Sequence, residues 1–297
     1  MIHVIFTGGT IGSTLKDDFI SSDNKKKNKL LGFIKEDVIS HVPYEILSEN
    51  LDGDYLNLLI NTIKEILKEK PDGIIITHGS DTLHITASML DIVFNKVDVP
   101  IVLVASNYPI EDKRANGIIN LNNAISFIND VKEKGVYVSY QNSDKKSYIH
   151  RGQFLSPIQE FTWDLFSVSN NYFGIFNNGK FIKNSEFENG ALEEINEYKL
   201  SKYSDVLLID SMAGIKYPDP SGYKNVIIKA YHSGTINVND NLKKFIKACD
   251  KLNIKVYLCG LRDDLDHYET VKEYEKLKME IVYNMSLTTL YNLLWIK

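Results

Sequence analysis

The chain has 297 residues, of which 43% are hydrophobic and 25% are charged, and its formal net charge is −5. This length allows one large or two medium globular domains with ordinary cores. The negative balance argues against binding to a nucleic-acid backbone, and Cys249 and Cys259 lie in no CxxC motif or Cys/His cluster, so a disulfide framework and a zinc site are disfavoured.

The N-terminus leads from Met1 directly into the short apolar run Ile2–Phe6, which is too short for the apolar region of a signal peptide. No stretch of the sequence approaches the ~20 apolar residues that a membrane-spanning helix needs. We therefore expect a cytoplasmic protein that has no membrane partner.

Short apolar runs alternate with helical segments through the first half of the chain. The runs are Ile2–Phe6, Gly73–Thr77, Ile101–Ala105 and Val136–Tyr140. Between them, segments 52–70 and 116–131 repeat apolar residues with helical period. This alternation predicts an α/β fold in which a mostly parallel sheet is flanked by helices. We assign it to a larger N-terminal domain, residues 1–185.

A second set of strands follows a polar stretch. Residues 177–201 lose apolar periodicity, and the runs Val206–Asp210, Val226–Ala230 and Lys255–Cys259 come after them. We predict an inter-domain linker at 186–203 and a smaller C-terminal α/β domain with a parallel sheet at 204–297. The polar segment 21–29 is predicted to be a mobile loop.

Small and polar residues follow the predicted strands, most notably in TGGTIG at 7–12 and HGSDT at 78–82. In an open parallel sheet the loops at the carboxyl ends of the strands gather at one edge, where ligands bind. The first loop is open to three interpretations: a phosphate cradle, a bare strand-to-helix turn, or the seat of a nucleophile. Its glycines do not have the G-x-G-x-x-G spacing, and the Gly-Lys-Ser/Thr of a P-loop is missing, so the phosphate interpretation is disfavoured.

The second loop has two interpretations. Asp81 is suited to capping the helix that follows, and Ser80 with Asp81 is equally suited to form a polar pair beside a ligand at a helix N-terminus. His78 is expected to be structural. The loop is not a G-x-S-x-G nucleophile elbow, which disfavours an α/β-hydrolase.

The two loops together resemble the signature motifs of bacterial-type L-asparaginases, whose usual forms are TGGTI and HGTDT. Further stretches are similar to that family in order and spacing: LSENLD at 47–52, PIEDKRANGIINLNNAI at 109–125, and more loosely YIHRGQF at 148–154 and MSLTTLYNLL at 285–294. The resemblance covers nearly the whole chain, and it is greatest to the cytoplasmic branch.

The resemblance implies that Thr10 attacks the side-chain amide carbon of an amino acid and releases ammonia. Backbone N–H groups of Thr10 and Ser80 would form the oxyanion site, Asp81 would hold the α-ammonium group, and Ser48 the α-carboxylate. The implied catalytic residues are Thr10, Ser80 and Asp81. The implied substrate-binding residues are Gly9, Ser48, Glu49, Gly79, Ser80 and Asp81. The resemblance also implies a small-molecule amino acid or amide substrate, no metal or organic cofactor, no nucleic-acid partner, and a homodimer or homotetramer.

The sequence departs from the family at four positions. Phe19 stands where the family has a tyrosine after TGGTI, and Ser80 where it has a threonine, so that a hydroxyl is kept. Pro157 stands where the family has the catalytic lysine, and Thr235 where it has an asparagine. Because proton transfer by a positioned side chain typically contributes ~10²–10⁴-fold, two hypotheses follow. The first is an amidohydrolase that forms an ester on Thr10, with weak activity or altered specificity; the second is an amino-acid-binding homologue that acts as a sensor or regulatory partner. Transamidation of a charged tRNA is a third, less favoured alternative.

Overall fold

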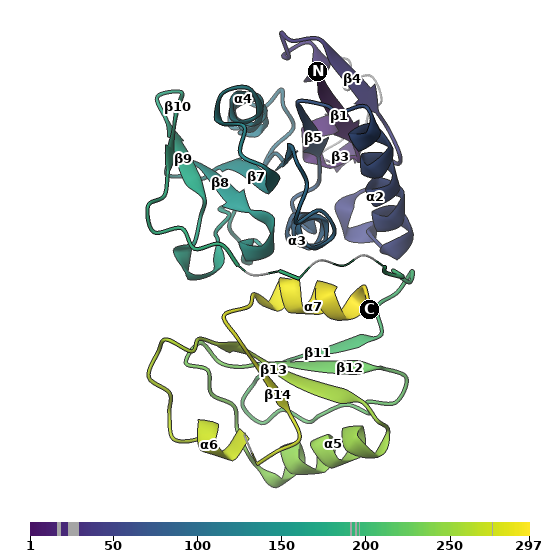
Figure 1. Ribbon diagram of the computed structural model, residues 1–297, viewed down its shortest axis with the longest axis vertical. Coiled ribbons are helices and arrows are strands. Elements are labelled where there is room, and N and C mark those ends of the chain that lie inside the picture. Colours follow the sequence, from purple (N-terminus) through teal and green to yellow (C-terminus); the bar gives the residue numbers. More distant parts are fainter. Residues whose placement is uncertain (17–18, 23–29, 191, 194, 196, 275) are drawn as a thin grey trace. The chain divides into compact units, whose positions relative to one another are not determined.

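The computed structural model describes residues 1–16, 19–22, 30–190, 192–193, 195, 197–274 and 276–297, with residues 13–16 and 19–22 described by their backbone only. The described chain divides into two compact units, Met1–Glu197 and Tyr198–Lys297. Each unit is built on its own sheet (Figure 1). We predicted a mobile loop at 21–29, and most of it, residues 23–29, lies outside the described residues.

The first unit holds an eight-stranded sheet whose order is β10-β9-β8-β7-β6-β5-β1-β4. From β7 to β4 neighbouring strands are parallel, whereas β8, β9 and β10 add on antiparallel. The strands are β1 (Ile2–Phe6), β4 (Val38–His41), β5 (Gly73–Thr77), β6 (Pro100–Val104), β7 (Gly135–Gln141), β8 (Ser147–Arg151), β9 (Gly174–Asn177) and β10 (Lys180–Lys183). A separate two-stranded hairpin pairs β2 (Ser13–Lys16) with β3 (Phe19–Ser22).

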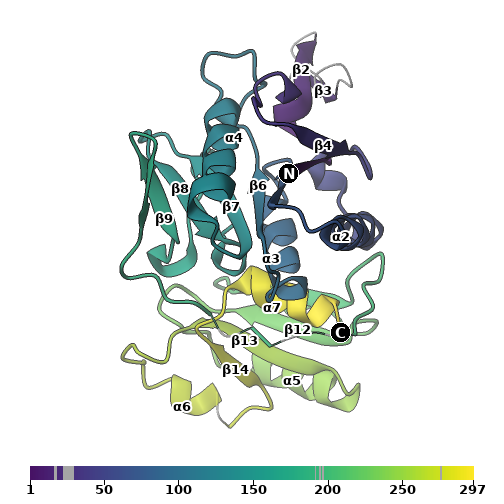
Figure 2. The same cartoon turned by 45° about the horizontal axis from the view of Figure 1, so that its top comes forward.

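The helices α2 (Gly53–Lys68), α3 (Leu83–Val93) and α4 (Gly117–Ser126) accompany this sheet. The start of α2 is fixed by Asp52, whose carboxylate accepts hydrogen bonds from the N–H groups of Asp54 and Tyr55 at 2.9 and 3.3 Å. A π-helical turn, Phe127–Val131, extends α4. Figure 1 shows α3 and α4 on opposite faces of the sheet at β7, and in Figure 2 α4 runs beside β6 and β7.

Alternation along the strands sorts side chains to the two faces of this sheet. One core contains Val4, Phe6, Val102 and Val104 together with Leu121 of α4, and all of them are at most 3% exposed. Successive strand residues point to opposite faces, so the intervening ones point to the other face of the sheet. Strands that are buried on both faces read as continuous apolar runs, which is why the sequence revealed them.

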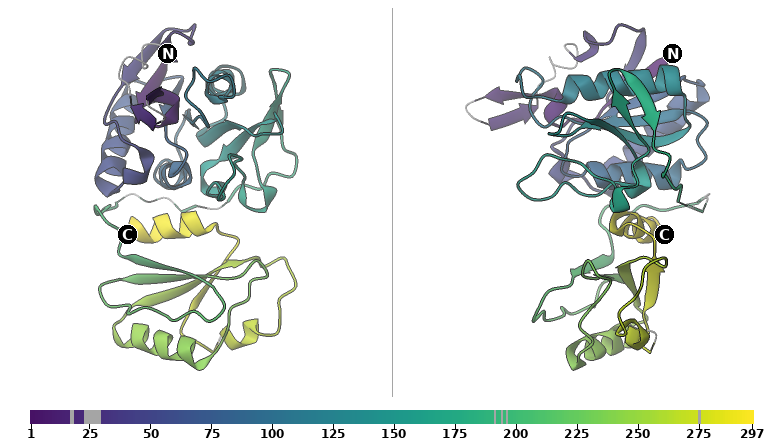
Figure 3. Two further views of the ribbon diagram at one scale, coloured as in Figure 1. Left: turned by 180° about the vertical axis from the view of Figure 1, so that it is seen from behind. Right: turned by 90° about the vertical axis from the view of Figure 1, so that its left-hand side faces the viewer.

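The second unit has a fully parallel sheet of order β11-β12-β13-β14, formed by Val206–Asp210, Asn225–Lys229, Lys255–Leu261 and Glu280–Tyr283. Helices α5 (Asp240–Lys251) and α7 (Leu287–Trp295) cover its opposite faces (Figure 3), and α6 (Val271–Tyr274) is a short turn. Val226 and Ile228 pack in the core under α5, whereas Ile227 between them packs in the core under α7.

The predicted fold class, a larger α/β unit with a mostly parallel sheet followed by a smaller parallel α/β unit, is confirmed. Within the described part of the chain, no helix combines the length and the apolar character needed to cross a membrane.

Candidate active site

Three chain segments meet beyond the carboxyl ends of β1 and β5. They are the turn after β1, the turn after β5, and a 3₁₀ turn at Ser48–Asn50. A Cβ atom placed on Gly79 would lie 2.4 Å from the Ser48 Oγ atom and 3.4 Å from the Gly9 Cα atom. The structure therefore brings Gly9, Ser48 and Gly79 into direct contact.

Gly8 and Gly9 are required by this contact. Their φ angles are +106° and +84°, in the region that favours glycine. A Cβ atom on Gly8 would lie 2.2 Å from the Ile46 carbonyl oxygen, and one on Gly9 would lie 2.4 Å from the Gly79 nitrogen. The two glycines let the first turn approach both of its neighbours.

Replacing Gly9 by alanine is expected to push the two turns apart. Backbone strain alone costs about 1–3 kcal/mol, so urea unfolding should show a decrease of that order in the free energy of unfolding. Any amide hydrolysis should be lost as well. Gly12 is the matched control, because nothing lies within 4 Å of a Cβ atom built there. Wild-type stability and turnover in Gly9→Ala would contradict the close contact.

Hydroxyl groups secure the same segments. The Thr7 hydroxyl donates to the Thr77 carbonyl oxygen at 2.7 Å, which joins the ends of β1 and β5. The Thr82 hydroxyl donates to the Ser48 carbonyl oxygen at 2.9 Å. These two bonds fix the backbone on which the candidate residues stand.

Thr10 opens a 3₁₀ turn, Thr10–Gly12, and is partly exposed, as is Ser80. Among the described residues, no hydrogen bond engages the backbone N–H group of Thr10 or of Ser80, or the Thr10 hydroxyl. Two free N–H donors on touching turns are the ingredients of an oxyanion site. Asp81 and Glu49 are exposed, and Ser48 is 6% exposed.

His78 is turned away from this edge and into the protein. Its Nδ1 atom lies 2.8 Å from the Gly79 carbonyl oxygen, which can only accept, so Nδ1 carries the proton. Its Nε2 atom then accepts from the Thr86 hydroxyl at 2.8 Å. Burial lowers the pKa of His78 to about 4. With both ring nitrogens engaged, His78 has no role as a base for Thr10.

Acid is expected to destabilise the fold through His78. The pKa of His78 is lower in the folded protein than in the unfolded chain. Between pH 6.5 and about 4 the unfolded chain therefore binds more protons than the folded protein, and the free energy of unfolding decreases as the pH falls through that range. The loss from His78 alone is roughly 3 kcal/mol. The pKa of His84 is also lowered to about 4 by burial, which adds in the same direction. Urea unfolding at several pH values measures the loss; an NMR titration of the His78 ring with a midpoint near 6.5 would contradict it.

Two of the departures from the family pattern, Phe19 and Pro157, have different surroundings. Phe19 begins β3, and its side chain lies outside the described part of the structure. Pro157 is exposed in a loop whose ends are joined by a hydrogen bond from the Ser156 N–H group to the Phe166 carbonyl oxygen at 2.9 Å. Within the described residues, no group of three or more His, Cys, Asp or Glu side chains is arranged to hold a metal ion.

An amide pair that was not predicted from the sequence shapes the next loop along the edge. The Asn107 N–H group donates to the Asn116 side chain and the Asn116 N–H group donates to the Asn107 side chain, both at 3.0 Å. Asn116 also donates to the Gln141 carbonyl oxygen at 2.8 Å. The only signal in the sequence was an amide just before a predicted helix, where Asn is a common cap.

Comparisons with known proteins show the family of the chain. A family model described as "Asparaginase, N-terminal" matches residues 1–187. A glutamyl-tRNA(Gln) amidotransferase subunit of Methanobrevibacter smithii is 28% identical over 302 aligned residues, which cover 92% of this chain and 66% of that protein. The subunit of the same name in Methanococcus maripaludis is 28% identical over 255 residues, which cover 77% of this chain and 58% of that protein. The chain thus spans two thirds or less of the length of these relatives.

Solved structures give the same result for the fold. The thermostable L-asparaginase of Thermococcus kodakarensis has a TM-score of 0.75 at 19% identity, covering 99% of this chain and 92% of that chain. L-asparaginase I of Vibrio cholerae has a TM-score of 0.76 at 18% identity, covering 98% and 90%. A probable cytoplasmic L-asparaginase of Campylobacter jejuni has a TM-score of 0.75 at 22% identity, covering 99% and 94%.

Proposed function

The chain belongs to the asparaginase family, and we propose that it hydrolyses a side-chain carboxamide, that of asparagine or a related amide, to a carboxylate and ammonia through an ester on Thr10. One observation carries the proposal. The turn that holds Thr10 touches the turn that holds Ser80 and Asp81, and each turn carries an N–H group, of Thr10 or of Ser80, that no described residue engages. A carbonyl group placed there would meet a hydroxyl nucleophile and oxyanion donors together.

In this proposal each residue has one task. The Thr10 oxygen attacks the amide carbon, and the Thr10 and Ser80 N–H groups bind the oxyanion. The exposed Asp81 carboxylate binds the α-ammonium group, while the Ser48 hydroxyl binds the α-carboxylate. Gly9 and Gly79 keep the turns close enough for one small amino acid to reach all of them, with Glu49 at the rim.

The proposed activity is tested by ammonia release. Purified protein is incubated with asparagine or glutamine, and aspartate binding is measured by calorimetry in parallel. Turnover of either amide supports hydrolysis. Binding of aspartate without turnover of any amide would instead support the second hypothesis, an amino-acid sensor or regulatory partner, because Phe19 and Pro157 supply neither the phenol nor the amine that the family uses at those positions.

A second catalytic role is favoured by the relatives that are named as amidotransferase subunits. In that role the same hydrolysis would supply ammonia to a partner protein rather than to solvent. Co-purification from the native host, followed by ammonia release with and without the partner, distinguishes the two. Stimulation by a bound partner supports the amidotransferase role.

Two expectations on assembly and location accompany the proposal. We propose a homodimer or homotetramer, since the resemblance implies sites that are completed across subunits; light scattering on purified protein measures this. We also propose a cytoplasmic location, as the name of the Campylobacter jejuni relative states for that protein.

A further inference from the structure

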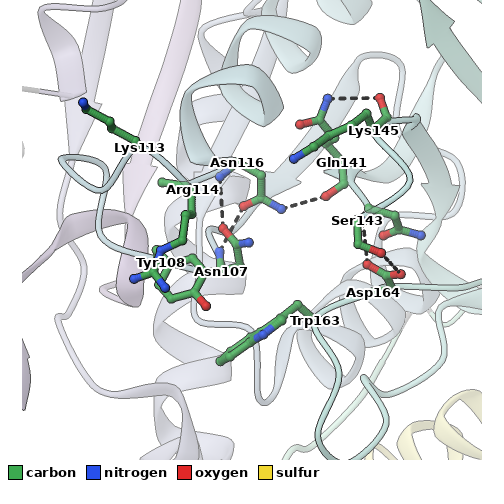
Figure 4. Close-up of a pocket in the computed structure, with 12 residues that line it drawn as sticks. Asn107, Tyr108, Lys113, Arg114, Asn116, Gln141, Ser143, Lys145, Trp163 and Asp164 are labelled. Atoms are coloured by element: carbon green, nitrogen blue, oxygen red, sulfur yellow. Dashed lines mark hydrogen bonds between the residues drawn. The ribbon is translucent and has the colours of Figure 1, made fainter.

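A cavity of about 290 Å³ opens at the carboxyl ends of β6 and β7, on the same edge of the sheet as the candidate active site. Figure 4 shows the residues that line it. Its walls include Tyr108 and Trp163, whose rings are 5.5 Å apart, and the charged residues Lys113, Arg114, Lys145 and Asp164. None of these side chains has a task in the hydrolysis proposed above.

The loop that forms one wall of the cavity contacts the turn that carries Thr10 through the start of α4. A Cβ atom on Gly117, at the start of α4, would lie 2.7 Å from the Ser106 Oγ atom and 3.2 Å from a side-chain carbon of Ile11. Ser106 and Gly117 flank the loop that forms one wall, and Ile11 follows Thr10 directly. This wall therefore lies one van der Waals contact away from the residue next to Thr10.

The opposite wall is held rigidly. The Tyr140 hydroxyl donates to the Trp163 carbonyl oxygen at 2.8 Å, and Asn142 forms two bonds of 2.9 Å with the backbone of Leu165. Asp164 accepts from the N–H and the hydroxyl of Ser143, both at 2.7 Å. Trp163 is 53% exposed, so this wall offers a fixed apolar surface to a ligand.

The charge of the cavity favours an anion. Arg114 lies 4.0 Å over the Tyr108 ring and is paired with Asp112 at 2.7 Å. The Lys145 ammonium group extends toward Asn116 and Gln141 (Figure 4), and among the described residues it has no hydrogen bond or ion pair. Lys113 points outward in the same view. Lys145 is thus a cation of the cavity wall that has no anionic partner among the described residues.

The position of the cavity relative to Ser48 and Asp81 indicates which part of a substrate would face it. Ser48 and Asp81, proposed to hold the α-amino acid, belong to segments that follow β4 and β5, whereas the cavity is built after β6 and β7. A substrate that is anchored by its α-groups and reacts at Thr10 has its leaving group at the other end. The cavity is larger than ammonia needs and suits an amine with a carboxylate and an apolar side chain.

We propose that the cavity binds the leaving amino acid of a β-aspartyl peptide, its carboxylate at Lys145 and its side chain against Trp163; this rests on the proposed function. The Thr10 oxygen would bond to the β-carbonyl carbon, the C–N bond would break, and the departing amine would take up the proton lost by Thr10. Water then hydrolyses the ester, so that peptide and water yield aspartate and a free amino acid.

The test compares β-aspartyl-leucine, its C-terminally amidated form and asparagine. Wild-type protein should hydrolyse β-aspartyl-leucine with a kcat/KM about tenfold or more above that for asparagine, since the added ion pair and apolar contact are used only by the peptide. Lys145→Gln should lower the ratio of kcat/KM for β-aspartyl-leucine to kcat/KM for asparagine roughly fivefold to tenfold, by raising KM for the peptide. The kcat/KM for the amidated peptide should not change. Lys132→Gln is the matched control: it removes the same charge from an exposed lysine whose φ of 56° is close to the 65° of Lys145.

Calorimetry on Thr10→Ala protein separates this inference from the proposed function. Even if no amide is hydrolysed, β-aspartyl-leucine should bind more tightly than aspartate, and Lys145→Gln and Trp163→Ala introduced into that protein should each weaken the peptide alone. Equal binding of peptide and aspartate, or equal effects of Lys145→Gln and Lys132→Gln, would overturn the inference. Peptide binding by Thr10→Ala protein, combined with no turnover of any amide by wild-type protein, would support the inference about the cavity and overturn the proposed hydrolysis.

Discussion

Thr10→Ala is expected to lower kcat/KM for the best amide substrate by about 10⁴-fold or more, because removing a covalent nucleophile abolishes the two-step route and leaves only binding and the oxyanion donors. Ammonia release measures the loss. The backbone N–H of residue 10 is retained, so aspartate binding and the unfolding midpoint should stay close to wild type. Thr10→Ser is the matched variant, since it restores a hydroxyl and should recover much of the lost rate. Full activity in Thr10→Ala would remove Thr10 as the nucleophile.

Asp91→Asn is expected to destabilise the first unit by about 3–5 kcal/mol, because it leaves the Arg151 charge buried without its partner. Asp91 and Arg151 side chains are 0% and 8% exposed, and their charged atoms lie 2.7 Å apart. Asp91 also accepts from the Gln153 N–H group at 2.9 Å. The pair joins α3, which begins just after the HGSDT turn, to the end of β8. Urea unfolding measures the change.

The control for Asp91 is an ion pair of the same length at the surface. Asp98 and Lys134 also lie 2.7 Å apart, but their side chains are 88% and 63% exposed. Asp98→Asn should leave the urea midpoint almost unchanged. Replacing both buried partners, as in Asp91→Leu with Arg151→Met, should cost less than Asp91→Asn alone, because no charge is then left unpaired. Equal effects of Asp91→Asn and Asp98→Asn would contradict the role assigned to the buried pair.

Several strands of both sheets could be predicted because each is a continuous apolar run. Ile2–Phe6, Gly73–Thr77 and Val206–Asp210 have the bounds that were predicted. The polar outer strand β10 was missed for a physical reason. β10 is formed by Lys180–Lys183, with mostly exposed side chains, and such a strand is specified by its partners rather than by its own composition.

The two sequence motifs of the candidate site could be predicted, but the contacts between them could not. The residues TGGT and HGSDT are adjacent only because β1 and β5 are neighbours in the sheet, although more than sixty positions separate them in the sequence. The role of Gly9 depends on its contact with Gly79, and the cavity at Trp163 depends on hydrogen bonds from Tyr140 and Asn142. Such contacts between distant segments leave no local pattern in the sequence.

The most direct measurement of the central claim is mass spectrometry of protein quenched in acid during turnover, followed by peptide mapping. We predict that the peptide containing Thr10 gains the mass of aspartate minus one water with asparagine or a β-aspartyl peptide as substrate, and that this gain is absent in Thr10→Ala. An ester on another residue, or steady turnover of these amides in Thr10→Ala, would contradict the account.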